Sequence, residues 1–344
     1  MANFHLSITD WYRQNARSLP WRETKNAYFI WLSEIILQQT RVNQGLNYFL
    51  KFQNNYPTVK HLAQASEQQV LADWQGLGYY SRARNLHFAA KIVVNDFNGV
   101  FPSSFEDLKK LKGVGDYTAS AIASFAFDLP HAVVDGNVFR VISRLYDIET
   151  PIDTNEGKKI FDSIAKELLG QNPPAIHNQA IMEFGALQCV PANPNCEICP
   201  LVSQCLAFKN KTIAERPQKR GKIVPKNRYF HFVQFVDGEN ILLEKRIGKD
   251  IWQHLFQFPL IEYEQNTELS EIEEQLVNRF EMCPTAVSSQ IKHVLTHQKI
   301  YAYVWKFDSF PVKNRMDSEW LIVNKNDLIN YPIPRLLDRY LLEE

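Results

Sequence analysis

Two carboxylates lie in apolar surroundings where they could act on a substrate. Glu34 lies in YFIWLSEIILQQTRV, where it shares one helical face with Trp31 and Gln38. A glutamate inside such a helix is costly unless it is solvated, paired or protonated. Burial beside Trp31 would raise its pKa, as a general acid requires. The alternative is a glutamate at the edge of the core, paired with Arg41 or another base, and this segment alone does not decide between the two.

The second carboxylate, Asp135, lies in AVVDGNVFRVISRL between two apolar runs. Aspartate is a favoured N-cap, and a helix that starts near Asn137 would explain its position. A carboxylate fixed at a helix start is also well placed to face a developing positive charge. Both roles are compatible.

Gly113 and Gly115 flank Val114 between an expected helix over 105–111 and a second helix that starts near Tyr117. Glycines allow backbone angles that a Cβ resists. The unpaired amides at the start of the second helix suit a phosphate oxygen. The simpler alternative is that the glycines only end one helix and begin the next. We predict a helix-hairpin-helix that grips a nucleic-acid backbone without reading its sequence.

Cys189, Cys196, Cys199 and Cys205 form a C-x6-C-x2-C-x5-C array. In a cytosolic chain such an array indicates a metal site rather than disulfides. Four thiolates suit either zinc or an iron-sulfur cluster, and their chemistry alone does not choose between them. Cys283 lies far away and is expected to behave as a small apolar residue.

Tyr79 and Tyr80 lie on a glycine turn ahead of Arg82 and Arg84. Such aromatics can enter a base stack while arginines hold phosphates. Alternatively both tyrosines anchor the core, which we favour for Tyr80.

The chain has 344 residues, enough for two domains, with 38 basic and 38 acidic residues and thus no net charge. Apolar residues recur with helical spacing in the first half of the chain, and at every second position, as in strands, from Arg228. Between them, 209–228 is a basic segment that we predict to be a linker. No apolar run approaches the length of a membrane span, so we expect a cytoplasmic protein with no membrane partner.

KGVGDYTA, VDGN and the cysteine array together resemble the endonuclease-III-like DNA glycosylase superfamily. SEIILQQTRV, GLGYYSRARN and DGNV resemble its MutY-type adenine glycosylase branch. The resemblance implies an all-α helix-hairpin-helix domain over 1–208 with a [4Fe-4S] loop over 189–205, the linker 209–228, and an α+β Nudix-like domain over 229–344. It also implies a bacterial-type, nucleoid-associated monomer that acts on duplex DNA with adenine opposite 8-oxoguanine or guanine.

The resemblance also assigns roles. Glu34 would be the general acid and Asp135 the stabiliser of the sugar cation, with Tyr117 and Asn137 in support. The remaining implied residues are the adenine pocket of Arg17, Leu19, Trp21, Arg22 and Gln179; the DNA and lesion contacts Gln39, Thr40, Arg41, Tyr79, Gly113, Gly115, Thr296 and His297; and the cluster ligands Cys189, Cys196, Cys199 and Cys205.

Three positions qualify the resemblance. Tyr117 stands where bifunctional members carry a lysine, and a phenol cannot form an imine, so we expect plain hydrolysis without strand nicking. Asp116 stands where relatives often carry a basic residue, and its negative charge would repel phosphate. Leu295, Thr296 and His297 stand where the family usually has Phe-Ser-His. Thr296 keeps the hydroxyl of the serine, but the aromatic residue is lost. No Nudix box is present, so nucleotide hydrolysis is not expected.

Two other functions fit parts of the pattern. Another glycosylase of the superfamily, for thymine mismatches or oxidised pyrimidines, is disfavoured by the added C-terminal domain, and Tyr117 also argues against the oxidised-pyrimidine enzyme. A non-catalytic lesion-binding protein is disfavoured because both Glu34 and Asp135 are present.

Overall fold

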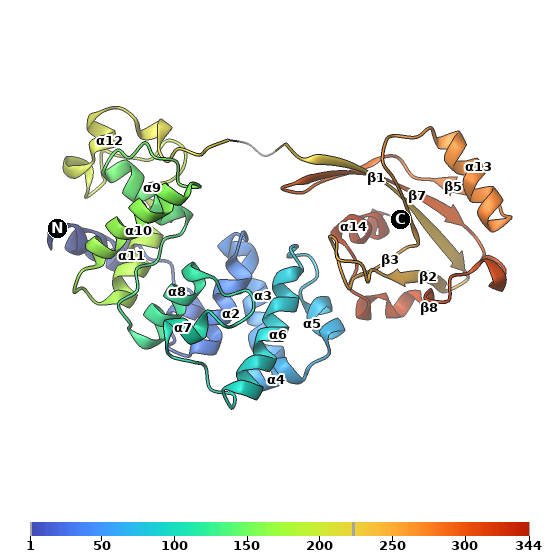
Figure 1. The fold of residues 1–344 in the computed structure, drawn as a ribbon, viewed down its shortest axis with the longest axis horizontal. Coiled ribbons are helices and arrows are strands. Elements are labelled where there is room, and N and C mark those ends of the chain that lie inside the picture. Colours follow the sequence, from blue (N-terminus) through green and yellow to red (C-terminus); the bar gives the residue numbers. More distant parts are fainter. Residues whose placement is uncertain (1, 222–223, 344) are drawn as a thin grey trace. The chain divides into compact units, whose positions relative to one another are not determined.

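Helices dominate the chain up to Lys209, as the apolar spacing predicts (Figure 1). The structure, a computed structural model, describes residues 2–221 and 224–343. The helices are α1 Ala2–Asn15, α2 Ala27–Leu37, α3 Val42–Asn55, α4 Val59–Gln64, α5 Glu67–Asp73, α6 Ser81–Asp96, α7 Phe105–Leu108, α8 Asp116–Phe127, α9 Gly136–Leu145, α10 Asn155–Leu169, α11 Pro174–Leu187 and α12 Leu206–Lys209, with short 3-10 turns at Pro20–Arg22, Val202–Gln204 and Ile213–Glu215.

Strands begin at Lys226, two residues before Arg228, from which the sequence predicts a period of two. The elements of this region are β1 Lys226–Asp237, β2 Asn240–Lys245, β3 Phe256–Gln257, β4 Leu260–Tyr263, α13 Leu269–Phe280, β5 Ala286–Val287, β6 Ile291–Val294, β7 Gln298–Phe307, β8 Leu321–Asn324 and α14 Arg335–Glu343, with 3-10 turns at Lys313–Arg315 and Lys325–Asn330. The predicted fold class, a helical domain followed by an α+β domain, is confirmed.

By their contacts, the described residues form two compact units, 2–64 with 88–221 and 65–87 with 224–343. The second unit therefore includes α5, the glycine turn and the start of α6 together with the strand-rich region. The predicted domain boundaries at 208 and 229 follow the secondary structure rather than these contacts, and they stay a prediction.

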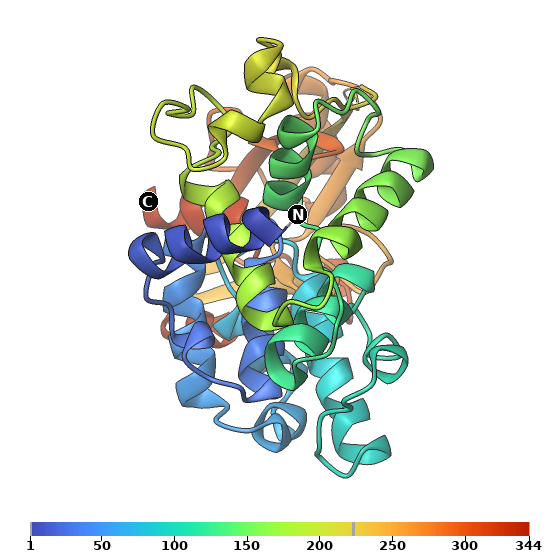
Figure 2. The ribbon, with the colours of Figure 1, turned by 90° about the vertical axis from the view of Figure 1, so that its left-hand side faces the viewer.

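Side-chain caps explain where several helices of the first unit begin. Asn26 accepts from the Tyr28 amide at the start of α2, Ser104 caps α7 and Thr154 caps α10. The core of this unit joins α1, α9, α10 and α11, and α1 packs against α11 (Figure 2). These contacts fix the two helices that carry Asp135 and Gln179.

The sheet of the second unit runs in the order β3-β2-β1-β7-β5, with β1 and β7 parallel. Alternation along β1 places Phe230 and Phe232 in one core with Leu336 of α14, and Val233 and Phe235 in another with α13. Both faces of the sheet are therefore covered. In the described part of the chain, no helix is long and apolar enough to cross a membrane.

Candidate functional site

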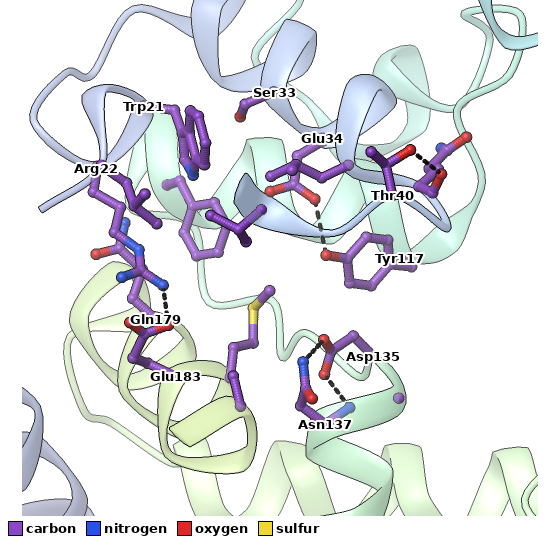
Figure 3. A pocket seen from close by; sticks show the side chains of 18 of the residues that line it. Trp21, Arg22, Ser33, Glu34, Thr40, Tyr117, Asp135, Asn137, Gln179 and Glu183 are labelled. Carbon is purple, nitrogen blue, oxygen red and sulfur yellow. Dashed lines mark hydrogen bonds and ion pairs between the residues drawn. The ribbon is translucent and has the colours of Figure 1, made fainter. Parts of the chain in front are cut away.

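A cavity of about 540 Å³ lies within the first unit, between α2, the start of α8, the start of α9 and α11 (Figure 3). Both predicted carboxylates line it. The structure brings together all of the residues assigned to catalysis and to the adenine pocket, and two assigned to DNA contact: Arg17, Leu19, Trp21, Arg22, Glu34, Gln39, Thr40, Tyr117, Asp135, Asn137 and Gln179.

Glu34 is buried on α2 and accepts a 2.8 Å hydrogen bond from the Tyr117 hydroxyl. Burial raises its pKa to about 7; the negative charge of Asp135 adds to this effect, and the Tyr117 hydrogen bond opposes it. Burial also raises the pKa of Tyr117, so the phenol is the hydrogen donor. At neutral pH, Glu34 is therefore poised between its two protonation states.

Asp135 caps α9. One carboxylate oxygen accepts from the amides of Asn137 and Val138 at 2.9 and 2.7 Å, and the other accepts from the Asn137 side-chain amide at 2.7 Å. Burial raises the pKa of Asp135, whereas these donors favour the ionised form and oppose that rise. The cap that the sequence suggested and the position facing the cavity thus coexist.

Asn137 is itself held by its neighbours. Arg140 donates to its side-chain oxygen at 2.9 Å, and a Cβ on Gly185 of α11 would lie 2.7 Å from the Asn137 Cβ. Only glycine at 185 therefore allows α11 to approach α9 this closely. This approach keeps the carboxylate and its amide partner rigid.

Glu183 is a cavity residue that the sequence analysis missed. It accepts from Arg17 Nη2 and Arg22 Nη2, both at 2.6 Å (Figure 3). Burial acts to raise its pKa, but the hydrogen bonds from Arg17 and Arg22 outweigh burial and hold the pKa at about 2. An acid inside the apolar stretch AIMEFGAL was the available signal, of the same kind that identified Glu34.

The predicted hairpin joins α7 to α8. Gly113 has a positive φ of 82°, and Gly115 precedes α8 without a side-chain cap, so the first amides of α8 are left for another acceptor. Asp116 forms an ion pair with Lys109 at 2.5 Å. The charge that we expected to repel phosphate is thus partly neutralised by a neighbouring lysine.

The residues at the end of α2 lie at the edge of the cavity. Gln39 is exposed with a φ of 55°, and Thr40 is half-buried. Arg41 is exposed and precedes α3. Glu34 accepts its hydrogen bond from Tyr117 rather than from Arg41. This contact favours the buried acid over the alternative of a core-edge pair with Arg41.

The second unit has a smaller cavity of about 330 Å³, lined in part by Tyr79, Trp252, Thr296 and His297. The Tyr79 hydroxyl lies 2.7 Å from Thr296 Oγ1. Tyr79 is 47% exposed, whereas Tyr80 is buried, as the core alternative for Tyr80 predicted. Tyr79 is the side chain of this pair that a ligand could reach.

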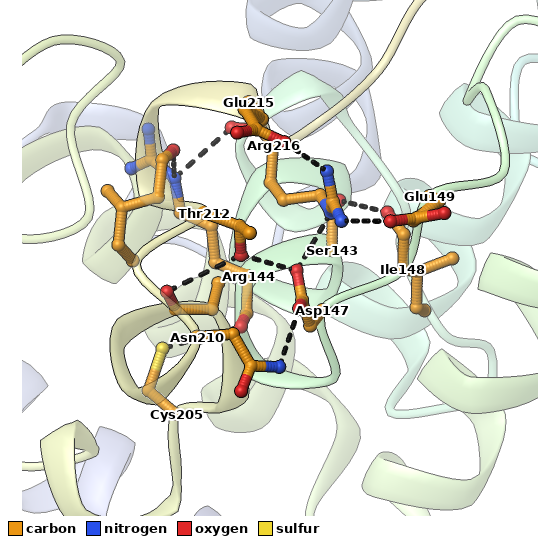
Figure 4. A network of polar contacts seen from close by, with 12 residues as sticks. Ser143, Arg144, Asp147, Ile148, Glu149, Cys205, Asn210, Thr212, Glu215 and Arg216 are labelled. Carbon is orange, nitrogen blue, oxygen red and sulfur yellow. Dashed lines mark hydrogen bonds and ion pairs between the residues drawn. The ribbon is translucent and has the colours of Figure 1, made fainter.

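The four-cysteine loop is tied to α9 through Arg144. The Arg144 guanidinium donates to Cys189 Sγ at 3.4 Å and to the carbonyl oxygens of Val190 and Pro191. The Cys205 thiol in turn donates to the Arg144 carbonyl (Figure 4). Cys199 lies within electrostatic reach of the other three thiols. However, no group of three or more His, Cys, Asp or Glu side chains within 2–221 and 224–343 has the geometry to hold a metal ion.

Arg216 lies in the segment predicted as a linker, yet its guanidinium is almost completely buried. It pairs with Asp147 and Glu149, each at 2.9 Å, and with Glu215 at 3.4 Å (Figure 4). This part of the segment is therefore anchored to the residues that follow α9.

The chain is similar to known DNA repair proteins over most of its length. Residues 32–167 match the HhH-GPD superfamily of base excision DNA repair proteins, and 231–343 match the NUDIX domain. The adenine DNA glycosylase of Buchnera aphidicola subsp. Baizongia pistaciae is 36% identical, over 96% of this chain and 94% of its own. The human adenine DNA glycosylase is 42% identical over 59% of this chain and 39% of its own.

Among solved structures, a thermostable thymine-DNA glycosylase superposes with a TM-score of 0.56 and 28% identity, over 60% of this chain and 95% of its own. A non-covalent complex of endonuclease III with DNA gives a TM-score of 0.54 at 21% identity, over 61% of this chain and 95% of its own. The second likeness shows a shared fold for the helical region.

Proposed function

Because the chain belongs to the adenine DNA glycosylase family of the HhH-GPD superfamily, we propose that it hydrolyses the N-glycosidic bond of adenine opposite 8-oxoguanine or guanine in duplex DNA. The observation that carries this proposal is the buried Glu34, with a pKa of about 7, in a cavity that also holds Asp135. Two carboxylates with different environments are what cleavage of a glycosidic bond requires.

Adenine must leave the base stack to reach this cavity. In its protonated form, Glu34 gives a proton to N7 of the flipped base, which turns adenine into a better leaving group. Tyr117 orients the acid through its hydrogen bond. The proton therefore comes from a group that is partly protonated at neutral pH.

As the bond breaks, positive charge develops on the sugar. Asp135 remains ionised, supported by the amides of Asn137 and Val138, and stabilises that charge electrostatically or as a transient covalent partner. Because Tyr117 stands in place of a lysine, no imine forms and the product keeps an uncut strand.

The other cavity residues bind the base. Arg17 and Arg22 are fixed by Glu183, and Trp21 lies on the same side of the cavity (Figure 3). Gln39, Thr40, Arg41 and the hairpin glycines Gly113 and Gly115 contact the duplex. In the second unit, Tyr79, Thr296 and His297 recognise the base opposite adenine. The protein acts as a monomer.

We also propose that Cys189, Cys196, Cys199 and Cys205 would hold a [4Fe-4S] cluster, because their C-x6-C-x2-C-x5-C spacing resembles the iron-sulfur loop of this family. Arg144 holds that loop on α9. When bound, such a cluster crosslinks the loop through iron-sulfur bonds. The loop then presents Lys209 and Lys211 to phosphate. Iron and sulfide analysis with a visible spectrum tests the assignment, and a colourless protein with one zinc per chain would refute it.

Single-turnover cleavage of three duplexes tests the function: adenine opposite 8-oxoguanine, adenine opposite guanine, and thymine opposite guanine, each with and without alkali. We expect the first to react fastest, with strand breaks only after alkali. Breaks without alkali would disprove the inference from Tyr117. A preference for thymine opposite guanine would instead support a thymine-mismatch glycosylase.

A further inference from the structure

The turn that carries Tyr79 has an unfavourable backbone. Gly76, Gly78 and Tyr79 have φ values of 95°, 73° and 47°. A left-handed conformation is easy for glycine but costly for tyrosine, so such a turn persists only where its surroundings hold it. Within the turn, Trp74 Nε1 donates to the Gly78 carbonyl at 3.1 Å.

A second set of hydrogen bonds comes from residues 333–338 of the same compact unit. The side-chain oxygen of Gln75 accepts from the Ile333 amide at 3.3 Å, and its Nε2 donates to Asp338 Oδ1 at 3.0 Å. Arg335 donates to the Gly76 carbonyl at 3.0 Å. Both ends of the Gln75 amide therefore connect the turn to the start of α14.

The buried Tyr80 adds two hydrogen bonds to this connection. Its hydroxyl accepts from the Gly76 amide at 3.4 Å and donates to the Ile333 carbonyl at 3.3 Å. The exposed Tyr79 hydroxyl lies against Thr296. The side chain proposed to meet the opposite base is thus presented by a turn that the C-terminal segment holds in place.

We propose that Gln75 is a positioning residue for opposite-base discrimination: it fixes the strained turn so that Tyr79 and Thr296 act on the same base. This inference rests on the proposed function. Gln75 acts through Tyr79 and does not itself touch the reacting atoms. Its contribution depends on one acceptor and one donor, which an amide provides and a methyl group does not.

The chemistry of the pair allows a rescue. Gln75→Glu keeps an acceptor for the Ile333 amide but sets a carboxylate against Asp338. Adding Asp338→Asn returns a donor at position 338. The double variant Gln75→Glu with Asp338→Asn therefore keeps the hydrogen bond from the Ile333 amide and restores the one between 75 and 338 with its direction reversed. Gln75→Ala removes both.

The first measurement is hydrogen exchange of the 76–80 amides in the free protein. We expect faster exchange in Gln75→Ala and in Gln75→Glu, and wild-type exchange in the double variant. The second measurement is the ratio of single-turnover rates for adenine opposite 8-oxoguanine and opposite guanine. We expect Gln75→Ala to lower this ratio about fivefold, as the loss of roughly 1 kcal/mol predicts, with the guanine duplex little changed and the ratio restored in the double variant.

Gln68→Ala is the matched control, because Gln68 donates to the Asn330 carbonyl from α5 and lies outside the turn. It should leave both measurements unchanged. Wild-type exchange or wild-type discrimination in Gln75→Ala would overturn the inference. A wild-type protein that cleaves neither duplex would refute the proposed function instead, and the exchange experiment would then still decide whether Gln75 holds the turn.

Discussion

The Tyr117 hydroxyl donates a 2.8 Å hydrogen bond to Oε2 of Glu34, and the two residues lie 83 positions apart in the chain. The bond favours the ionised acid, whereas burial favours the protonated one. Tyr117 therefore does more than occupy the place of a lysine. It also lowers the pKa of Glu34 toward neutral pH, where the proposed general acid would give up its proton.

Removing the Tyr117 hydroxyl should move the pH dependence of the reaction. In the wild-type protein we expect the single-turnover rate to fall tenfold per pH unit above about 7, as Glu34 loses its proton. In Tyr117→Phe the midpoint should rise by roughly one pH unit, because a hydrogen bond to a charged group contributes about 1.5 kcal/mol. Rates between pH 5 and 9 measure this. Tyr146→Phe, at the exposed end of α9, is the control, and a midpoint that moves down would contradict the assignment.

Glu34 should destabilise the protein at high pH. Its pKa is raised in the folded protein from 4.5 to about 7, so above pH 7 folding buries a carboxylate that is charged in both states. Glu34→Gln should therefore be more stable than wild type by about 3 kcal/mol at pH 8, with an advantage that shrinks between pH 7 and 4.5. Urea unfolding at pH 4, 6 and 8 tests this. Equal stability at pH 8 would mean that the carboxylate is better solvated than the structure indicates.

Asp135 both caps α9 and carries the negative charge proposed to stabilise the sugar cation. Two substitutions separate these roles. Asparagine is as good a cap as aspartate and can still accept from the Asn137 and Val138 amides, although it loses the acceptor for the Asn137 side chain. Asp135→Asn should therefore keep the cap yet lose at least about a hundredfold in single-turnover rate. Asp135→Ala should lose the activity and, in addition, about 1–3 kcal/mol of stability, because buried amides lose their acceptor. Thr154→Ala removes the cap of α10 and serves as control: it should cost about 1 kcal/mol and leave the rate unchanged. Full activity in Asp135→Asn would refute the electrostatic role.

Much of the site could be predicted because its signals are local. An acid on an apolar helical face identifies Glu34, and an aspartate before a turn identifies Asp135. Glu183 carries the same kind of local signal, but its pairing with Arg17 and Arg22 could not be predicted, because Arg17 lies 166 residues away in the chain. The buried position of Arg216 was equally hidden, since a basic stretch with prolines resembles a solvated tether and its partners Asp147 and Glu149 lie far from it in the chain. The α+β region was predictable because β1 and β7 are long strand-like apolar segments. Phe230–Phe235 of β1 are all buried, and buried positions alternate with half-buried ones along most of β7.

Glu183 should stabilise the folded protein, in contrast to Glu34. Its folded-state pKa is lowered from 4.5 to about 2, so the stabilisation is complete above pH 4.5 and is lost as the pH falls toward 2. Glu183→Gln keeps the volume but leaves Arg17 and Arg22 facing each other without an anion, which should cost about 3 kcal/mol at pH 7 and less at pH 3. Unfolding at both pH values measures the difference, and Asp10→Asn, which removes an exposed pair with Arg13, should change stability by less than about 0.5 kcal/mol. If the two variants behave alike, the Arg17 and Arg22 side chains do not depend on Glu183 for their position. If Glu183→Gln is destabilised as expected, it should also weaken binding of adenine-containing duplexes, because Arg17 and Arg22, which line the cavity proposed to hold the base, lose the residue that orients them.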